Sequence, residues 1–241
     1  MIFYKRMSPV KIISFDLDDT LYDNIPVIAN AEKVFASYLC KKYFLPDMAR
    51  DPDFWMIMRS ECCIKDPKLE DDMSLWRQKS LQRGLKKFGI VLDEKSATDE
   101  VKRFVRIRSD FKVPASSLKL LENLKKNYHL VALSNGNSDL NQNGLAPYFD
   151  LDLRPSYAGD RRKPSSDLFL RAASFFNVSP YEILHIGDDP VTDVRGAVGA
   201  GCQCIWFCGG FAGLNAGWEN IRVLPHVQIS KFEDLRRLLS A

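Results

Sequence analysis

Three short polar clusters, each following an apolar run, carry the residues of this 241-residue chain that could do chemistry. The clusters are Asp16-Leu17-Asp18-Asp19-Thr20, Ser134-Asn135-Gly136 and Gly187-Asp188-Asp189, and Lys163 stands in a fourth polar segment. Carboxylates brought close together would repel one another unless a cation compensated them. Oxygen ligands without His or Cys suit a hard cation such as Mg²⁺. The hydroxyl, amide and ammonium groups are donors for a phosphate, so the residue types predict a phosphate ester held against Mg²⁺.

The spacing of Asp16 and Asp18 suits covalent phosphoryl transfer. One carboxylate can attack phosphorus and form an aspartyl-phosphate. A second carboxylate two residues later can protonate the leaving oxygen and then activate water. Mg²⁺ and a lysine ammonium would offset the charge on the transferring phosphoryl group. The pattern therefore indicates a reaction class as well as a ligand.

The hydrophobic pattern predicts the elements that must position these groups. Residues 11–15 form a short apolar run, residues 26–111 show helical periodicity, and short strands alternate with helices from residue 114 onward. Such alternation implies a parallel sheet that helices cover on both faces. Ligands of open parallel sheets bind beyond the carboxyl ends of the strands. We therefore expect the polar clusters to converge on one edge of the sheet.

Four segments together resemble the motifs of the haloacid-dehalogenase-like hydrolases. Residues 15–21 resemble the first motif, and Ser134-Asn135, Lys163-Pro164 and Gly187-Asp188-Asp189-x₃-Asp193 resemble the second, third and fourth in order. The resemblance implies an α/β fold, with a Rossmann-like parallel sheet core, helices on both faces and an inserted helical cap. The implied domains are residues 1–21 with 112–241 for the core, and residues 22–111 for the cap.

The resemblance also implies a role for each acidic residue that would touch the reaction. Asp16 would be the nucleophile and Asp18 the general acid and base. Mg²⁺ would be held by the Asp16 side chain, the Asp18 backbone carbonyl and Asp188.

The remaining motif residues would bind phosphate or support the centre. By resemblance, Ser134 and Asn135 would bind phosphate, and Lys163 would orient both the nucleophile and the phosphate. Asp189 and Asp193 would support the metal site and Lys163 without binding the metal directly. Taken by themselves, Asp189 and Asp193 also fit a turn residue and a residue in the first turn of a helix.

A narrower resemblance, to the bacterial flavin mononucleotide phosphatase group, implies a substrate. The matching residues are 21–28, 134–137, 183–189 and 224–226. The group also dephosphorylates 5-amino-6-(5-phospho-D-ribitylamino)uracil, so FMN or this precursor is the expected small phosphorylated metabolite. Family dehalogenases lack a second Asp two residues after the nucleophile, and Asp18 therefore argues against carbon–halogen chemistry.

Other functions stay open at this stage. Within the superfamily these are a nucleotide or sugar phosphatase and a phosphomutase. Outside it, they are a phosphate-binding regulatory module without turnover and a phosphoryl-accepting signalling domain. Tyr22 could line the entrance of the cap, whereas Trp55 and Trp76 fit helical packing and His185 fits a packed strand histidine.

The composition limits the class of protein. Hydrophobic residues make up 46%, charged residues 27%, and the net charge is +3, a balance typical of globular chains. Nucleic-acid-binding proteins usually carry a larger, clustered basic excess, and no apolar run reaches the roughly 20 residues that span a bilayer. Of the six cysteines only Cys204 and Cys208 have the spacing of a zinc-binding pair, and no second pair or His set follows. We expect reduced thiols, a cytoplasmic location, and neither nucleic-acid nor membrane partners.

Overall fold

A mixed but mainly parallel sheet forms the centre of the molecule. The structure is a computed structural model that describes residues 1–211 and 223–239. In this part of the chain the sheet has seven strands in the order β1-β7-β6-β5-β2-β3-β4, and only β1 runs antiparallel to its neighbour. The strands are β1 (Ile2–Phe3), β2 (Ile12–Phe15), β3 (His129–Leu133), β4 (Leu151–Leu153), β5 (Ile183–Gly187), β6 (Gln203–Phe207) and β7 (Val227–Ile229).

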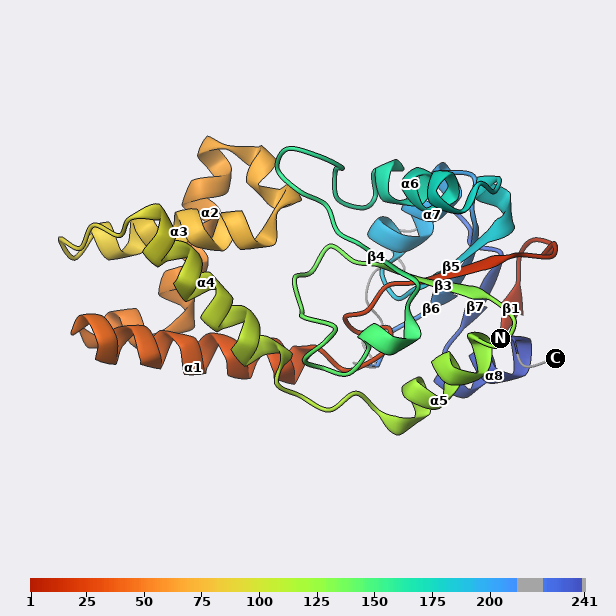
Figure 1. Cartoon of the computed structure of the whole chain (residues 1–241), viewed down its shortest axis with the longest axis horizontal. Coiled ribbons are helices and arrows are strands. Elements are labelled where there is room, and N and C mark those ends of the chain that lie inside the picture. Colours follow the sequence, from red (N-terminus) through yellow and green to blue (C-terminus); the bar gives the residue numbers. More distant parts are fainter. Residues whose placement is uncertain (212–222, 240–241) are drawn as a thin grey trace.

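Helices cover both faces of this sheet, as the sequence predicts. One face packs against α5 (Ala115–Leu124) and α8 (Phe232–Leu239), the other against α6 (Asp167–Phe176) and α7 (Gly196–Gly199) (Figure 1). Successive side chains of a strand point to opposite faces. Accordingly, Ile13 and Phe15 of β2 belong to the first core, and Ile12 belongs to the second. The predicted α/β fold class is confirmed.

The chain between β2 and α5 forms a separate helical unit, residues 25–109. It contains α1 (Ile25–Tyr43), α2 (Pro52–Lys65), α3 (Met73–Lys86) and α4 (Glu94–Ser109), with 3₁₀ turns at Asp47–Arg50 and Pro67–Asp71. Figure 1 shows these helices at one end of the molecule, beside the sheet. Phe35, Trp55 and Phe104 lie in a core of their own, and Trp55 therefore packs as the helical periodicity predicts. The domain boundaries at residues 21/22 and 111/112 stay a prediction.

The register of the central strands brings the polar clusters level with one another. Phe15, the last residue of β2, pairs with Ala132 of β3 on one side and with Ile186 of β5 on the other. The residues that follow these strands therefore leave the sheet at the same edge. A π-helical turn, Pro190–Arg195, follows β5 and leads into α7.

Two further expectations bear on the character of the chain. Among the described residues, no helix is both long and apolar enough to cross a membrane. Cys202 and Cys204 are buried thiols, and burial raises the pKa of Cys202 to about 12.

Candidate active site

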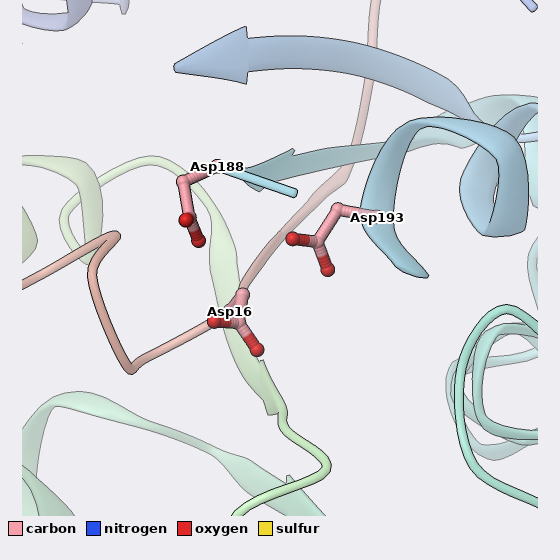
Figure 2. Close-up of side chains that lie close together, drawn as sticks. All are labelled: Asp16, Asp188 and Asp193. Atoms are coloured by element: carbon pink, nitrogen blue, oxygen red, sulfur yellow. The ribbon is translucent and has the colours of Figure 1, made fainter. Parts of the chain in front are cut away.

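Three carboxylates meet at the edge where β2 and β5 end. Asp16 follows β2, Asp188 follows β5, and Asp193 lies in the π-helical turn. Each offers an oxygen that lies within 4.8 Å of the others, and Figure 2 shows the three side chains turned toward one another. The expected convergence of the first and fourth motifs is therefore present in the structure.

Lys163 is the cation of this cluster. Its Nζ donates to Asp16 Oδ1 at 2.7 Å and to Asp193 Oδ1 at 2.6 Å, and its side chain is 1% exposed. Burial lowers the pKa of Lys163, but Asp16 and Asp193 outweigh burial and raise it above the ordinary value. Lys163 is therefore a fixed ammonium that touches the proposed nucleophile directly.

Asn135 fixes the backbone of Lys163. The Lys163 N–H donates to Asn135 Oδ1 at 2.9 Å, and Asn135 Nδ2 donates to the Lys163 carbonyl at 3.0 Å. Both the oxygen and the nitrogen of the Asn135 side chain thus bind Lys163, which lies 28 positions further along the chain. Ser134, also predicted to bind phosphate, is buried, and its Oγ accepts from the N–H of Gly136 at 3.0 Å. These contacts place the second motif beside Lys163.

Asp193 is surrounded by donors from several elements. Besides Lys163, it accepts at Oδ2 from the Asp189 N–H at 3.0 Å, and its Oδ1 lies 3.2 Å from His185 Nε2. Burial raises the pKa of Asp193, but Lys163 and His185 outweigh it and hold that pKa well below its usual range. A Cβ on Gly187 would fall 2.3 Å from Asp193 Cγ. The glycine of the fourth motif therefore makes room for the Asp193 carboxylate.

His185 and Asp189 have local partners. His185 is fully buried in β5 and contacts Ser14 Oγ through Nδ1 at 2.9 Å, as expected of a packed strand histidine. Asp189 Oδ1 accepts from the N–H groups of Val191 and Thr192 at 2.8 and 2.6 Å. The Asp189 side chain thus caps the turn that carries Asp193, in agreement with its interpretation as a turn residue.

The carboxyls of Asp16 and Asp188 both have pKa values above the ordinary range of a carboxyl. Burial raises the pKa of Asp16 to about 7 despite the lowering effect of Lys163. Burial, with Asp193 and Asp16, raises the pKa of Asp188 to about 9. A cation between the two carboxylates would favour their charged forms. Because Asp193 is already bound by Lys163 and His185, Asp16 and Asp188 are the side chains that fit a hard cation such as Mg²⁺.

Asp18 is held by different partners. Tyr22 donates its hydroxyl to Asp18 Oδ1 at 2.6 Å, and Arg108 Nη2 lies 2.9 and 3.0 Å from the two Asp18 oxygens. Arg108, near the end of α4, has a side chain only 3% exposed. No motif in the sequence predicts a role for Arg108. The available signal was an arginine on the helical stripe that contains Ala97, Val101 and Phe104.

Comparisons with known proteins agree with this arrangement. Residues 10–201 match the haloacid dehalogenase-like hydrolase family. The chain is 34% identical over 241 residues to 5-amino-6-(5-phospho-D-ribitylamino)uracil phosphatase YigB of Escherichia coli, covering 99% of this chain and 100% of that protein. It is 28% identical to the phosphoserine phosphatase of Thermus thermophilus, covering 82% and 88% of the two chains.

A solved structure extends the likeness to three dimensions. The 2-haloacid dehalogenase of Pseudomonas syringae pv. tomato matches with a TM-score of 0.79 and 28% identity, over 96% of this chain and 98% of that one. The chain belongs to the haloacid dehalogenase-like hydrolase family. The predicted class of enzyme, a phosphatase, is confirmed by these comparisons.

Proposed function

We propose that the chain is a Mg²⁺-dependent phosphomonoester hydrolase that acts through an aspartyl-phosphate. The preferred substrate is FMN or 5-amino-6-(5-phospho-D-ribitylamino)uracil. The observation that carries the proposal is the contact of Lys163 with both Asp16 and Asp193, at 2.7 and 2.6 Å, beside the Asp188 carboxylate. This arrangement supplies a nucleophile, a fixed positive charge and a position for a divalent cation.

In the first half of the reaction, the Asp16 carboxylate attacks phosphorus. The bond between phosphorus and the ester oxygen breaks, and that oxygen takes the bonding electron pair together with a proton from Asp18. In the second half, Asp18 takes a proton from a water molecule as the water oxygen attacks phosphorus. The bond from phosphorus to Asp16 breaks, which releases inorganic phosphate and restores Asp16.

The remaining polar groups stabilise charge during both halves. Lys163 would bind the phosphoryl oxygens while it stays bound to Asp16, and Ser134 would donate to the same group. Asp16, Asp188 and the Asp18 backbone carbonyl would hold Mg²⁺, which when bound supplies positive charge against the transferring phosphoryl group. Asp189 and Asp193 would keep these groups in place through the turn and Lys163.

The preference for a riboflavin-pathway substrate rests on the relative of known activity and on the space beside the motifs. A cavity of about 250 Å³ lies between the start of α3 and the residues that follow β3. Polar side chains of Ser74, Asn137 and Arg154 line it. Its position next to Asn135 and Gly136 suits a polar leaving group, such as a ribityl chain, whose phosphate reaches Asp16.

The experiment is phosphate release from a panel of phosphorylated metabolites, with and without Mg²⁺, by the wild type and by Asp16→Asn. The panel contains FMN, 5-amino-6-(5-phospho-D-ribitylamino)uracil, phosphoserine, a nucleotide and a sugar phosphate, with 2-chloropropionate as a dehalogenase substrate. We expect Mg²⁺-dependent release, fastest from the two flavin-related esters, and a loss of at least about 10⁴-fold in Asp16→Asn. Metal-independent turnover or an active Asp16→Asn enzyme would contradict the mechanism.

The same assay separates the alternatives. Equal rates on unrelated phosphate esters would remove only the substrate preference. Transfer of phosphate to a second substrate without release would indicate a mutase, and a long-lived phosphoaspartate would indicate a signalling domain. No turnover on any ester would favour a regulatory module, and chloride release would favour a dehalogenase. A cytoplasmic location stays a prediction, which fractionation of cells that express the protein would test.

A further inference from the structure

Arg108 joins the helical unit to the carboxylate expected to transfer protons. It belongs to α4, whereas Asp18 follows the central strand β2, 90 positions away. One terminal nitrogen, Nη2, donates to both Asp18 oxygens and lies 3.2 Å from Asn24 Oδ1. The other, Nη1, donates to Asn137 Oδ1 at 3.0 Å. The guanidinium therefore spans Asp18 and the loop after β3.

The surroundings leave this guanidinium little freedom. A Cβ built on Gly136 would lie 2.7 Å from Asp18 Oδ2 and 3.3 Å from Arg108 Nη1, so the loop backbone packs directly against the pair. Tyr22 also donates to Asp18, at Oδ1. Arg108 Nε is buried and has no hydrogen-bond partner, which is costly for a cationic group. A buried arginine that Asp18 and Asn137 hold in place at this cost indicates a role at the site.

We propose that Arg108 is the positioning residue for Asp18, and that proton delivery to the leaving group depends on α4 being docked on the α/β unit. The inference rests on the proposed function, because Asp18 must be the acid. When Asp18 gives up its proton, negative charge develops on its carboxylate, and the guanidinium already lies against both oxygens. A preorganised charge of this kind stabilises the transition state, and the contacts of Nη2 with Asp18 and of Nη1 with Asn137 fix the direction of the carboxylate.

Two other roles fit the contacts less well. A substrate ligand must face the bound substrate, but the Arg108 side chain is only 3% exposed and its terminal nitrogens contact Asp18, Asn24 and Asn137. A purely structural latch between the two units does not require contact with Asp18. Arg162 joins the two units without touching Asp18, because its Nη1 donates to Glu70 Oε2 of the helical unit at 2.9 Å. Arg162 therefore offers a matched control.

The test compares two leaving groups. p-Nitrophenolate leaves phosphorus without needing a proton, whereas the alkoxide of an alkyl phosphate such as FMN does need one. The parameter is kcat/KM, which covers the steps up to release of the leaving group. We expect Arg108→Met to lower kcat/KM for the alkyl ester by about 10²-fold, the order of a general-acid contribution, and to change that for p-nitrophenyl phosphate much less. Arg162→Met should affect both esters equally.

A double variant shows whether Arg108 acts through Asp18. In an Asp18→Asn background, replacing Arg108 by Met should cause no further selective loss on the alkyl ester, because the acid is already absent. Arg108→Lys should recover part of the loss. If Arg108→Met does not fold, as thermal unfolding would show, Asn24→Ala must produce the same selectivity at smaller size, since it removes a partner of Nη2 outside the proposed substrate cavity.

Two outcomes overturn the inference. One is an equal loss of kcat/KM on both esters in Arg108→Met, which would make the residue structural. The other is an undiminished selective loss in the Asp18→Asn background. Failure of the proposed function looks different, because the wild type would then lack turnover that depends on Asp16. Wild-type turnover without selectivity in Arg108→Met removes only the role of Arg108.

Discussion

The α/β unit and the helical unit both bury ion pairs, but with opposite balance of charge. At the strand edge, the carboxylates of Asp16, Asp188 and Asp193 share one ammonium, that of Lys163. In the helical unit, the Glu32 carboxylate lies between two guanidinium groups, with Arg77 Nη2 at 2.7 Å and Arg59 Nη1 at 3.1 Å. The first cluster has an excess of negative charge, and the second supplies its own counterions.

The pKa directions follow from this difference. Burial raises the pKa of Glu32, but Arg77 and Arg59 outweigh burial and lower it. At the strand edge, burial together with the Asp193 and Asp16 charges raises the pKa of Asp188 to about 9. Burial alone therefore does not mark a reactive site. A buried carboxyl whose pKa stays strongly raised among its neighbours is a candidate ligand site, because a bound cation would favour its charged form.

Among the variants that compare the two clusters, the largest expected effect is on activity, from removal of the only lysine among the described residues of the strand-edge cluster. Lys163→Met takes away the donor to Asp16 and Asp193, so kcat/KM for phosphate release should fall on the order of 10³-fold. The matched control is Lys42→Met, which removes a lysine that pairs with Glu100 in the helical unit. We expect the control to keep the wild-type kcat. Wild-type activity in Lys163→Met would erase the functional contrast between the clusters.

The next effect is on stability, in the helical unit. Glu32→Gln leaves the buried Arg77 guanidinium, which is packed over the Phe104 ring, without its counterion. Breaking a buried pair in this way costs about 3 kcal/mol or more of unfolding free energy, and kcat of the folded enzyme should be unchanged. Urea unfolding measures the first and phosphate release the second. Glu94→Gln, at an exposed pair with Lys79, is the control and should leave the unfolding midpoint nearly unchanged.

How much the sequence could predict also differs between the two regions. The ends of β2, β3 and β5 could be predicted, because each apolar run stops at a polar cluster and parallel strands end at one edge. The short β1 and β7 were not predicted, since runs of two and three residues carry little pattern. In the helical unit, the periodicity predicts helices but does not predict how they pack against one another or against the α/β unit.

Contacts between distant segments explain what the sequence analysis missed at the site. The pairing of Arg108 with Asp18 depends on where α4 lies against β2, and no local pattern encodes that. The same holds for Asn135, whose amide binds the backbone of Lys163. In the sequence, an amide beside a serine predicts a phosphate ligand. Its actual partner, the Lys163 backbone, lies 28 positions away and is not visible in the local pattern. Residue type could be read from the motifs, but the partner of each side chain required the fold.

A third effect sharpens the contrast through metal binding. If the strand edge needs a cation and the helical unit does not, Mg²⁺ should raise the thermal unfolding midpoint only through Asp16 and Asp188. At 100 times its dissociation constant, a ligand of the folded state adds about 2.7 kcal/mol. Asp188→Asn should lose this stabilisation. Without Mg²⁺ at neutral pH it should unfold above the wild-type midpoint, because a carboxyl whose pKa folding raises to about 9 costs stability there. Equal stabilisation of both proteins by Mg²⁺ would place the cation elsewhere.

The smallest effect compares one glycine from each region, because neither has room for a Cβ. The Cβ would meet Asp193 Cγ at 2.3 Å from Gly187, and Trp55 Cζ3 at 2.6 Å from Gly84. Overpacking of this kind should lower the unfolding free energy of both alanine variants by about 1–2 kcal/mol. Calorimetry or urea unfolding measures this common part of the effect.

The two alanine variants should differ in activity although they resemble each other in stability. Gly187→Ala displaces Asp193, which holds Lys163 against Asp16, so its kcat should fall at temperatures where the protein is fully folded. Gly84→Ala strains the packing of α3 against Trp55, far along the chain from the strand edge, and should keep kcat. A Gly84→Ala enzyme that loses activity while folded would mean that packing inside the helical unit is transmitted to the site. Arg108 of α4, which contacts Asp18, is one residue through which that effect would reach the site.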